Sequence, residues 1–375
     1  MKISDFKLER YFAKYEFCTK YLLSSSDCDG YAMSYVLSCA GQEELDLWNN
    51  LKLGYTDSAG SRFLREAIAE QYCEMTVDNI LVSSPGEANF SFMNVFLKPG
   101  DEVICMRPAY QSLYQVAESL GCRVKFWEVR QQGSAYSFEL EDLEPLITSK
   151  TRLLIVNFPH NPTGYSPSLP QLKAMVDLAR EHNIFIFSDE MYFQLCNPEE
   201  RIPAVCDLYE NALSLWGMAK SFGLAGLRFG WAASARKDIL AKMMAFKDYL
   251  SICNNAAGEV LSCIALRHKG KFIGPNLDKI TRNRELFLEF SRKNHKFIGF
   301  TPPASGSTAL VELKSKPGAY EYGEMLVQET GIMLVPSEMF DFGNRHIRIG
   351  FGREIMPETL RAWQKYIDDH PELAA

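Results

Sequence analysis

Short apolar runs alternate with segments of helical periodicity between residues 80 and 217, and this alternation constrains the fold more than any other feature. Each run is short enough for a single strand, and the runs lie at 80–83, 102–106, 122–127, 152–157, 184–188 and 212–216. Strands that alternate with helices predict an α/β fold, with a large, mostly parallel sheet covered by helices on both faces. Ligands of such sheets bind beyond the carboxyl ends of the strands, so polar residues there are the first candidates for a site.

The pattern changes after about residue 255. A long helical stretch (256–294) is followed by short strand-like runs near 307–312 and 346–349, and a last helix follows Pro357. We therefore expect three parts: an N-terminal arm (1–45), a large ligand-binding domain (46–255) and a smaller α+β C-terminal domain (256–375). No Pro/Gly-rich linker separates them, so we expect close packing, with the arm against the small domain.

Composition limits the partners and the compartment. The net charge of −7 offers no basic field for nucleic acid. The longest stretch without Asp, Glu, Lys or Arg (153–172) contains four prolines, so no membrane span is expected. The first seventeen residues lack the apolar core of a signal peptide, and the ten cysteines are scattered, which favours reduced thiols in the cytoplasm. The six histidines show no metal-ligand spacing, and we expect no metal.

Three polar segments follow three of the strand-like runs: NFPHNPTG at 157–164, SDEMY at 188–192 and GMAKSFGLAGLRFGW at 217–231. Amine chemistry on pyridoxal 5′-phosphate (PLP) needs a lysine that forms an imine with the cofactor and an acid beside its ring nitrogen. It also needs cations and hydroxyls for the phosphate, and an arginine for the substrate carboxylate. The second segment supplies Asp189, and the third supplies Lys220 and Arg228.

These segments resemble the PLP-dependent aminotransferase superfamily of fold type I, class I/II, the aspartate-aminotransferase-like enzymes. The resemblance covers nearly the whole chain. It extends to YTDSAG at 55–60, PGDEV at 99–103, PAY at 108–110 and HIRIG at 346–350. Because all the motifs stand in the family order, chance similarity is a poor explanation, although each motif alone is weak.

The resemblance implies a role for each motif residue. Lys220 holds PLP as a Schiff base and moves the substrate proton, and Asp189 pairs with the ring nitrogen. Tyr192 and Asn161 bind the phenolic oxygen, Tyr110 stacks on the ring, and Arg348 binds the substrate carboxylate. Arg228 and the helix start at Ser84, Pro85 and Gly86 bind the phosphate, together with Tyr55 from the other subunit of a homodimer. The Asn161–Pro162 bond is expected to be cis.

The sequence departs from the family pattern around the phosphate. Ser84-Pro85-Gly86 stands where glycine and a hydroxyl residue are usual, and proline removes one backbone donor. Gly217 and Ala219 stand where the family has serines, so two hydroxyls are missing. Ser214 and Ser221 are candidates to replace them.

Several candidates have a plainer interpretation. Asp189 is also suited to cap a helix, Arg348 to form a structural salt bridge, and Tyr110 to pack in a core. We expect Arg353 to be solvated and His160 to be a loop histidine. Asp27 is a turn residue by this reasoning, although it is also placed to meet a basic substrate side chain.

The expected activity is transamination between an α-amino acid and a 2-oxo acid, in a ping-pong reaction. The alternative is PLP-dependent elimination, replacement or cyclisation. The segments LSSS (23–26), VNFPHNP (156–162) and DYL (248–250) are similar to capreomycidine synthase, a cyclising relative that acts on an arginine derivative. A PLP-binding regulator that acts through protein contacts also stays open. The sequence does not identify the amino acid.

Overall fold

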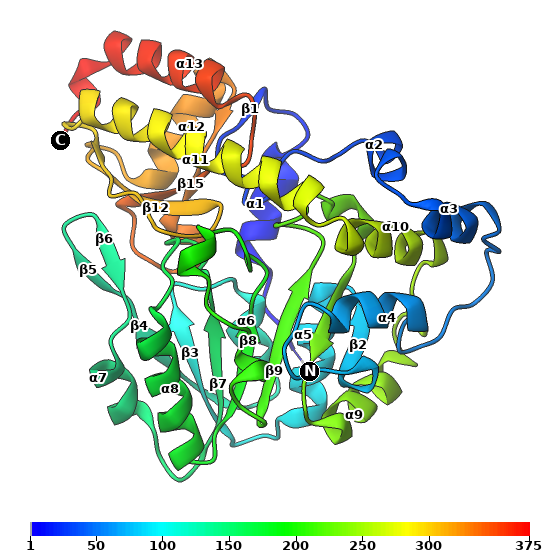
Figure 1. The fold of residues 1–375 in the computed structure, drawn as a ribbon. Coiled ribbons are helices and arrows are strands. Elements are labelled where there is room, and N and C mark those ends of the chain that lie inside the picture. Colours follow the sequence, from blue (N-terminus) through cyan, green and yellow to red (C-terminus); the bar gives the residue numbers. More distant parts are fainter. Residues whose placement is uncertain (1) are drawn as a thin grey trace.

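A seven-stranded sheet lies at the centre of the computed structural model, which describes residues 2–375 (Figure 1). Its strands run in the order β2 (Ile80–Ser83), β10 (Gly230–Ala233), β9 (Ala212–Gly217), β8 (Phe185–Asp189), β7 (Thr151–Asn157), β3 (Glu102–Arg107) and β4 (Arg123–Glu128). Neighbouring strands from β9 to β4 are parallel, whereas β10 is antiparallel to both β9 and β2. The predicted, mostly parallel sheet is confirmed, and β10 is a strand that the sequence pattern did not predict.

Helices cover both faces of this sheet, because successive side chains of a strand point to opposite faces. Val103 and Cys105 of β3 pack in one apolar cluster, whereas Ile104 and Met106 pack in another. The first cluster includes residues of α5 (Pro85–Phe96), α6 (Ser112–Ser119) and α9 (Lys237–Lys247). The second includes residues of α7 (Leu140–Leu143) and α8 (Leu169–Glu181). A small hairpin of β5 (Arg130–Gln132) and β6 (Ala135–Ser137) extends beyond β4 (Figure 1).

A second sheet has four strands, and its paired strands are antiparallel. Their order is β11 (Ile298–Gly299), β12 (Thr308–Leu313), β15 (His346–Gly350) and β14 (Val335–Pro336). Buried aromatic residues of α11 (Gly270–Lys293), α12 (Ala319–Thr330) and α13 (Met356–Asp369) pack in one core with this sheet, which Figure 1 shows above the large sheet. Strands β12 and β15 and the last helix were predicted near these positions, whereas β11 and β14 were not predicted.

The helical stretch predicted at 256–294 is two helices, α10 (Ala256–Arg267) and α11, with a break at residues 268–269. α10 lies against α4 (Arg62–Ala69), α3 (Gln42–Asn49) and α2 (Met33–Ser38). None of the helices within residues 2–375 combines the length and the apolar character needed to cross a membrane.

The N-terminal residues pack against the second sheet. Leu8, Tyr11 and Tyr15 of α1 (Lys7–Tyr15) are buried in a cluster with Met333 of β13 (Ile332–Met333) and Val335 of β14. The short strand β1 (Tyr21–Leu22) pairs in parallel with β13. The chain then continues as residues 23–29, which we call the inner arm.

The inner arm lies directly against the end of β15. Gly350 N–H donates to the Leu23 carbonyl over 2.8 Å, and Asp29 N–H donates to the Gly352 carbonyl over 3.0 Å. A Cβ atom at Gly350 would overlap the Ser25 carbonyl, and one at Gly352 would overlap the Asp27 carbonyl. The two glycines therefore allow a close approach that no other residue permits.

Candidate active site

A cavity of about 600 Å³ lies at the carboxyl ends of the parallel strands, between the large sheet and the second sheet. Asn157 and Asp189 reach it as the last residues of β7 and β8, and Arg348 reaches it from β15. Nine of the eleven predicted site residues line it: Pro85, Gly86, Tyr110, Asn161, Asp189, Tyr192, Lys220, Arg228 and Arg348. The structure thus brings most of the candidates together, as expected for strand ends of an α/β sheet.

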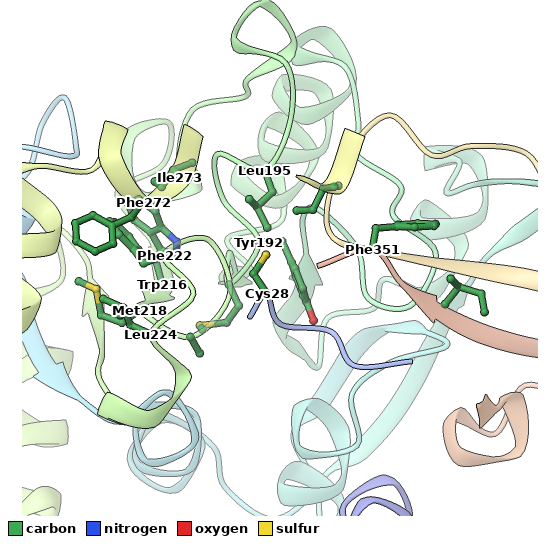
Figure 2. Packing of buried hydrophobic residues seen from close by; sticks show 14 of the residues in the cluster. Cys28, Tyr192, Leu195, Trp216, Met218, Phe222, Leu224, Phe272, Ile273 and Phe351 are labelled. Carbon is green, nitrogen blue, oxygen red and sulfur yellow. The ribbon is translucent and has the colours of Figure 1, made fainter. Parts of the chain in front are cut away.

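Lys220 lies on the loop between β9 and β10, and apolar neighbours hold this loop in place. Met218 and Phe222 are fully buried, and Figure 2 shows them grouped with Trp216 of β9 and Phe272 of α11. Lys220 itself is only half-buried, and its Nζ donates a 2.8 Å hydrogen bond to Ser26 Oγ. Because the residues around it are fixed by packing, the amine is held at the cavity.

Asp189 is a buried carboxyl group without an ion-pair partner in residues 2–375. Its Oδ1 accepts a 3.1 Å hydrogen bond from Met191 N–H. Burial raises the pKa of Asp189 to about 6, while the Met191 N–H and the charge of Lys220 act in the opposite direction. A cationic ring nitrogen is the kind of group that would stabilise this carboxylate. Within the described residues, the Asp189 side chain caps no helix, because the residues that follow it form turns.

Asn157 connects three parts of the site, although sequence reasoning assigned it no role. Its Nδ2 donates to the Asp189 carbonyl over 2.7 Å, and its Oδ1 accepts from Asn161 N–H over 2.7 Å. The Asn161–Pro162 peptide bond is cis, as predicted. Asn157 therefore ties the end of β7 to the end of β8 and to the loop that carries Asn161.

Arg348 is 1% exposed and has no carboxylate partner in the described part of the chain. Its Nε and Nη2 donate to the Ser24 carbonyl over 3.1 and 2.8 Å, and its Nη1 donates to Asn161 Oδ1 over 3.2 Å. Burial lowers its pKa. The structural salt bridge is therefore not formed, and N–H donors of the guanidinium are left for an anion.

The first residues of α5 and Arg228 also line the cavity. Ser84 caps α5 by accepting from Glu87 N–H over 3.3 Å, and Pro85 and Gly86 line the cavity wall. Arg228 is exposed and adopts a left-handed backbone conformation, with φ of 59°. A helix N-terminus next to an arginine favours a bound anion.

The serines considered as replacements for the missing phosphate hydroxyls do not reach the cavity. Ser214 donates to Glu190 Oε1 over 2.7 Å, and Ser221 donates to the Phe193 carbonyl over 2.5 Å. Both are fully buried and neither lines the cavity. Ser112 and Asn89 lie in the cavity wall instead, and the Asn89 Oδ1 atom is buried without a partner.

Acidic side chains from the N-terminal residues form another wall, and sequence reasoning found only one of them. Glu9 and Glu16 come from α1 and the residue after it, and Asp27 comes from the inner arm. Tyr110 donates a 2.7 Å hydrogen bond to Glu9 Oε1, and burial raises the pKa of Tyr110. The spacing of Glu9 and Glu16 places them on one helix face. The sequence around them does not indicate that this face lines the cavity.

The expectation for Arg353 is wrong, whereas His160 is a loop residue, as expected, although a buried one. Arg353 is not solvated, because its Nη2 donates to Asp27 over 2.9 Å in a largely buried ion pair. His160 is 1% exposed, and its ring contacts the Pro108 carbonyl and Thr163 Oγ1 at 2.9 and 2.7 Å. Burial lowers the pKa of His160 to about 3, so the ring is neutral. Asp27 and Pro108 lie far from Arg353 and His160 in the sequence, beyond the reach of a local pattern, whereas Thr163 lies on the same loop as His160.

The comparison with known proteins decides the family. The sequence model of "Aminotransferase class I and II" matches residues 19–362. The chain belongs to this family.

Individual relatives agree with this assignment. Capreomycidine synthase of Streptomyces vinaceus is 27% identical over 93% of this chain and 88% of its own. The arginine–pyruvate transaminase AruH of Pseudomonas aeruginosa is 26% identical over 82% of this chain and 80% of its own. The solved structure of a PLP-dependent aminotransferase from Streptococcus suis superposes with a TM-score of 0.92 over 98% of this chain and 99% of its own, at 23% identity.

Members of this family depend on PLP, and the cavity fits that cofactor. Lys220 is the one lysine among its lining residues, and Asp189 is a buried acid that lacks a cation. The start of α5 and Arg228 offer donors for a phosphate. Bound PLP supplies an aldehyde that a lysine amine captures, and a ring that withdraws electrons. The chain is therefore a PLP-dependent enzyme.

Proposed function

We propose that the protein is a transaminase that moves an amino group between an α-amino acid and a 2-oxo acid by a ping-pong reaction. The observation that carries this proposal is the single cavity that joins the Lys220 amine, the buried Asp189 carboxyl group and the buried Arg348 guanidinium. These residues come from the loop after β9, from β8 and from β15. Together they supply the base, the partner for a cationic ring and the binding group for a carboxylate.

The proposed roles follow the position of each residue in the cavity. Lys220 holds the cofactor and moves the proton at the substrate Cα, and Asp189 faces the ring nitrogen. Arg348 binds the α-carboxylate. The remaining groups orient the cofactor: Asn161 and Tyr192 at its phenolic oxygen, Tyr110 against its ring, and Ser84, Pro85, Gly86 and Arg228 at its phosphate.

The charges of the cavity support a substrate with a cationic side chain. Three cationic side chains line the cavity, those of Lys220, Arg228 and Arg348. In the proposed function, the first two bind the cofactor and the third binds the α-carboxylate. Among the carboxylates of the acidic wall, Glu16 has no hydrogen bond or ion pair in residues 2–375. Burial and the charges of Asp27 and Glu9 raise the pKa of Glu16. A substrate cation would relieve this repulsion, so we propose a basic amino acid as the amino donor.

Glu16→Gln tests this choice of substrate. Transamination of L-arginine, L-lysine, L-aspartate and L-phenylalanine is measured with pyruvate as acceptor. We expect the two basic amino acids to be the better donors, and the variant to lower kcat/KM for them about fivefold while leaving L-phenylalanine unchanged. Glu70→Gln, at an exposed glutamate on the end of α4, is the control. A preference for L-aspartate, or an equal loss for all four donors, would contradict the assignment.

A cyclisation or elimination enzyme is the second candidate, and the similarity to capreomycidine synthase favours it. The same assay separates the two functions. A transaminase consumes the 2-oxo acid in step with the amino acid, whereas an elimination or cyclisation enzyme turns over the amino acid without any acceptor. Turnover without pyruvate would therefore decide for the second candidate.

We further propose that the protein works as a homodimer with Tyr55 at the partner's phosphate site. Tyr55 is 89% exposed, lies on the segment between α3 and α4, and does not line the cavity of its own chain. Leu53, two residues earlier, is 86% exposed. A second copy of the chain would cover these side chains.

All ten cysteines are free thiols, which supports a cytoplasmic location.

Tyr55→Phe tests the role of this tyrosine. The loss of one hydroxyl that donates to a phosphate should weaken PLP binding about tenfold. The measurement is a fluorescence titration of the cofactor-free protein with PLP, and light scattering should give twice the chain mass of 42.6 kDa. Tyr320→Phe, at an exposed tyrosine of α12, serves as the control. A monomer, or unchanged PLP affinity in the Tyr55 variant, would refute the shared site.

A further inference from the structure

The Lys220 amine has one hydrogen-bond partner within residues 2–375, and that partner is not part of any motif around the lysine. Nζ donates to Ser26 Oγ over 2.8 Å. Lys220 follows β9 of the large sheet, whereas Ser26 belongs to the inner arm, which packs on the second sheet. The bond therefore joins the two halves of the cavity at its reactive nitrogen.

Ser26 is held in place by contacts on both sides along the chain. Its own carbonyl accepts a 2.6 Å hydrogen bond from Ser307 Oγ. On one side, the Ser24 carbonyl accepts from two nitrogens of Arg348. On the other, Asp27 pairs with Arg353 over 2.9 Å. The backbone that carries the Ser26 hydroxyl group therefore cannot move without breaking contacts with the residues around the second sheet.

The neighbouring serine cannot replace this contact. The Ser25 Oγ atom is buried and has no hydrogen-bond partner among residues 2–375, although Ser25 also lines the cavity. The Ser25 carbonyl is pressed against Gly350, which fixes the direction of the peptide. Ser25 and Ser26 therefore carry the same side chain at adjacent positions. Of the two, Ser26 is the one that forms a hydrogen bond with Lys220.

We propose that Ser26 is a positioning residue for Lys220. Its hydroxyl oxygen accepts a hydrogen bond from Nζ, holds the flexible lysine chain toward the inner arm, and stabilises the proton on the nitrogen. This inference rests on the proposed function, since it takes Lys220 as the lysine that holds the cofactor. A lysine side chain has several rotatable bonds, so a fixed acceptor narrows the positions from which its nitrogen acts.

The test uses the PLP-loaded protein and the visible absorbance of the lysine-bound cofactor, followed as a function of pH. Without the hydroxyl acceptor the nitrogen loses its proton more readily. We expect Ser26→Ala to move the pH midpoint of the absorbance change down by about one unit, a tenfold change in proton affinity. Ser26→Thr keeps the hydroxyl and should stay within a few tenths of the wild type, as should Ser25→Ala.

A second readout follows the proton that Lys220 moves. With an amino-acid substrate deuterated at Cα, Ser26→Ala should show a larger isotope effect on kcat than the wild type, together with about a tenfold lower kcat. Ser26→Thr should restore both values. If these substitutions only disturbed the structure, Ser26→Ala, Ser26→Thr and Ser25→Ala would all have lower activity. The isotope effect would then stay at the wild-type value.

The outcomes separate this inference from the function on which it rests. A normal wild-type band with the same midpoint in Ser26→Ala would overturn the role of Ser26 and leave the proposed function intact. Equal midpoint shifts in Ser25→Ala and Ser26→Ala would also overturn it. A wild-type protein that never develops a visible band with PLP would overturn the proposed function and this inference together.

Discussion

Lys220→Ala is expected to abolish turnover, with kcat at least about four orders of magnitude lower, because in the proposed function the variant loses both the covalent attachment of the cofactor and the base. No other lysine lines the cavity, so no neighbouring amine can take over. The packing of Met218 and Phe222 on either side is unaffected, and the fold should stay intact. The measurement is steady-state transamination, together with the thermal midpoint by circular dichroism.

Covalent attachment is checked separately from activity. The PLP-loaded protein is reduced with borohydride and digested, and the peptides are weighed. The wild type should carry the cofactor on the peptide that contains Lys220, and the variant should carry none. Lys242→Ala, at an exposed lysine of α9, is the control and should behave as the wild type. Reduction that labels another lysine, or a variant with the full visible absorbance, would contradict the assignment.

We expect Asp189→Asn to lower kcat by at least about two orders of magnitude, because in the proposed function the ring nitrogen loses the negative charge that keeps it protonated. Asparagine has the same shape and keeps an acceptor for Met191 N–H, so the fold and the cofactor attachment should persist. Glu190→Gln is the matched control. Glu190 is the next buried carboxyl group, but it points away to Ser214 and Val205. Near-normal turnover of Asp189→Asn would show that the Asp189 carboxylate is not needed to keep the ring nitrogen protonated.

The same variant changes how the stability of the cofactor-free protein depends on pH. The pKa of Asp189 is raised from 3.8 to about 6 by burial. As pH rises from about 4 to 6, the unfolded chain gives up this proton before the folded chain does. The folded state is therefore stabilised below this window, and the stabilisation is lost across it. At about 1.4 kcal/mol for each tenfold change in proton affinity, the loss is roughly 3 kcal/mol.

Urea unfolding at a series of pH values between 4 and 7 measures this effect. The free energy of unfolding of the wild type should fall with rising pH relative to that of Asp189→Asn, which has no proton to lose at this position. Parallel curves for the two proteins would show that the Asp189 carboxyl group is not desolvated in the cofactor-free fold.

The periodicity of the chain was enough to predict the large sheet. The runs at 80–83 and 102–106 coincide with β2 and β3 to within a residue, because a fully buried strand is a continuous apolar run. Strand β10 was not predicted. Its first two residues, Gly230 and Trp231, are the end of the motif at 217–231, and the strand pairs with β2 on one side and β9 on the other.

The site was predictable where it consists of motifs. Lys220, Asp189 and Asn161 line the cavity because each lies at or shortly after the end of a strand of the large sheet. Glu16 and Ser26 could not be found in this way. They reach the cavity only because α1 packs on the second sheet and glycines let the inner arm lie against β15. Such contacts between distant segments leave no local pattern.

The central claim is that this cavity exchanges an amino group between PLP and an amino acid, and an absorbance titration of the purified, PLP-loaded protein tests it most directly. We predict a visible band that is lost on addition of L-arginine or L-lysine and restored on addition of a 2-oxo acid. A protein that turns over the amino acid while the band persists, without any need for a 2-oxo acid, would contradict transamination. Absence of the band in the presence of excess PLP would contradict the cofactor site itself.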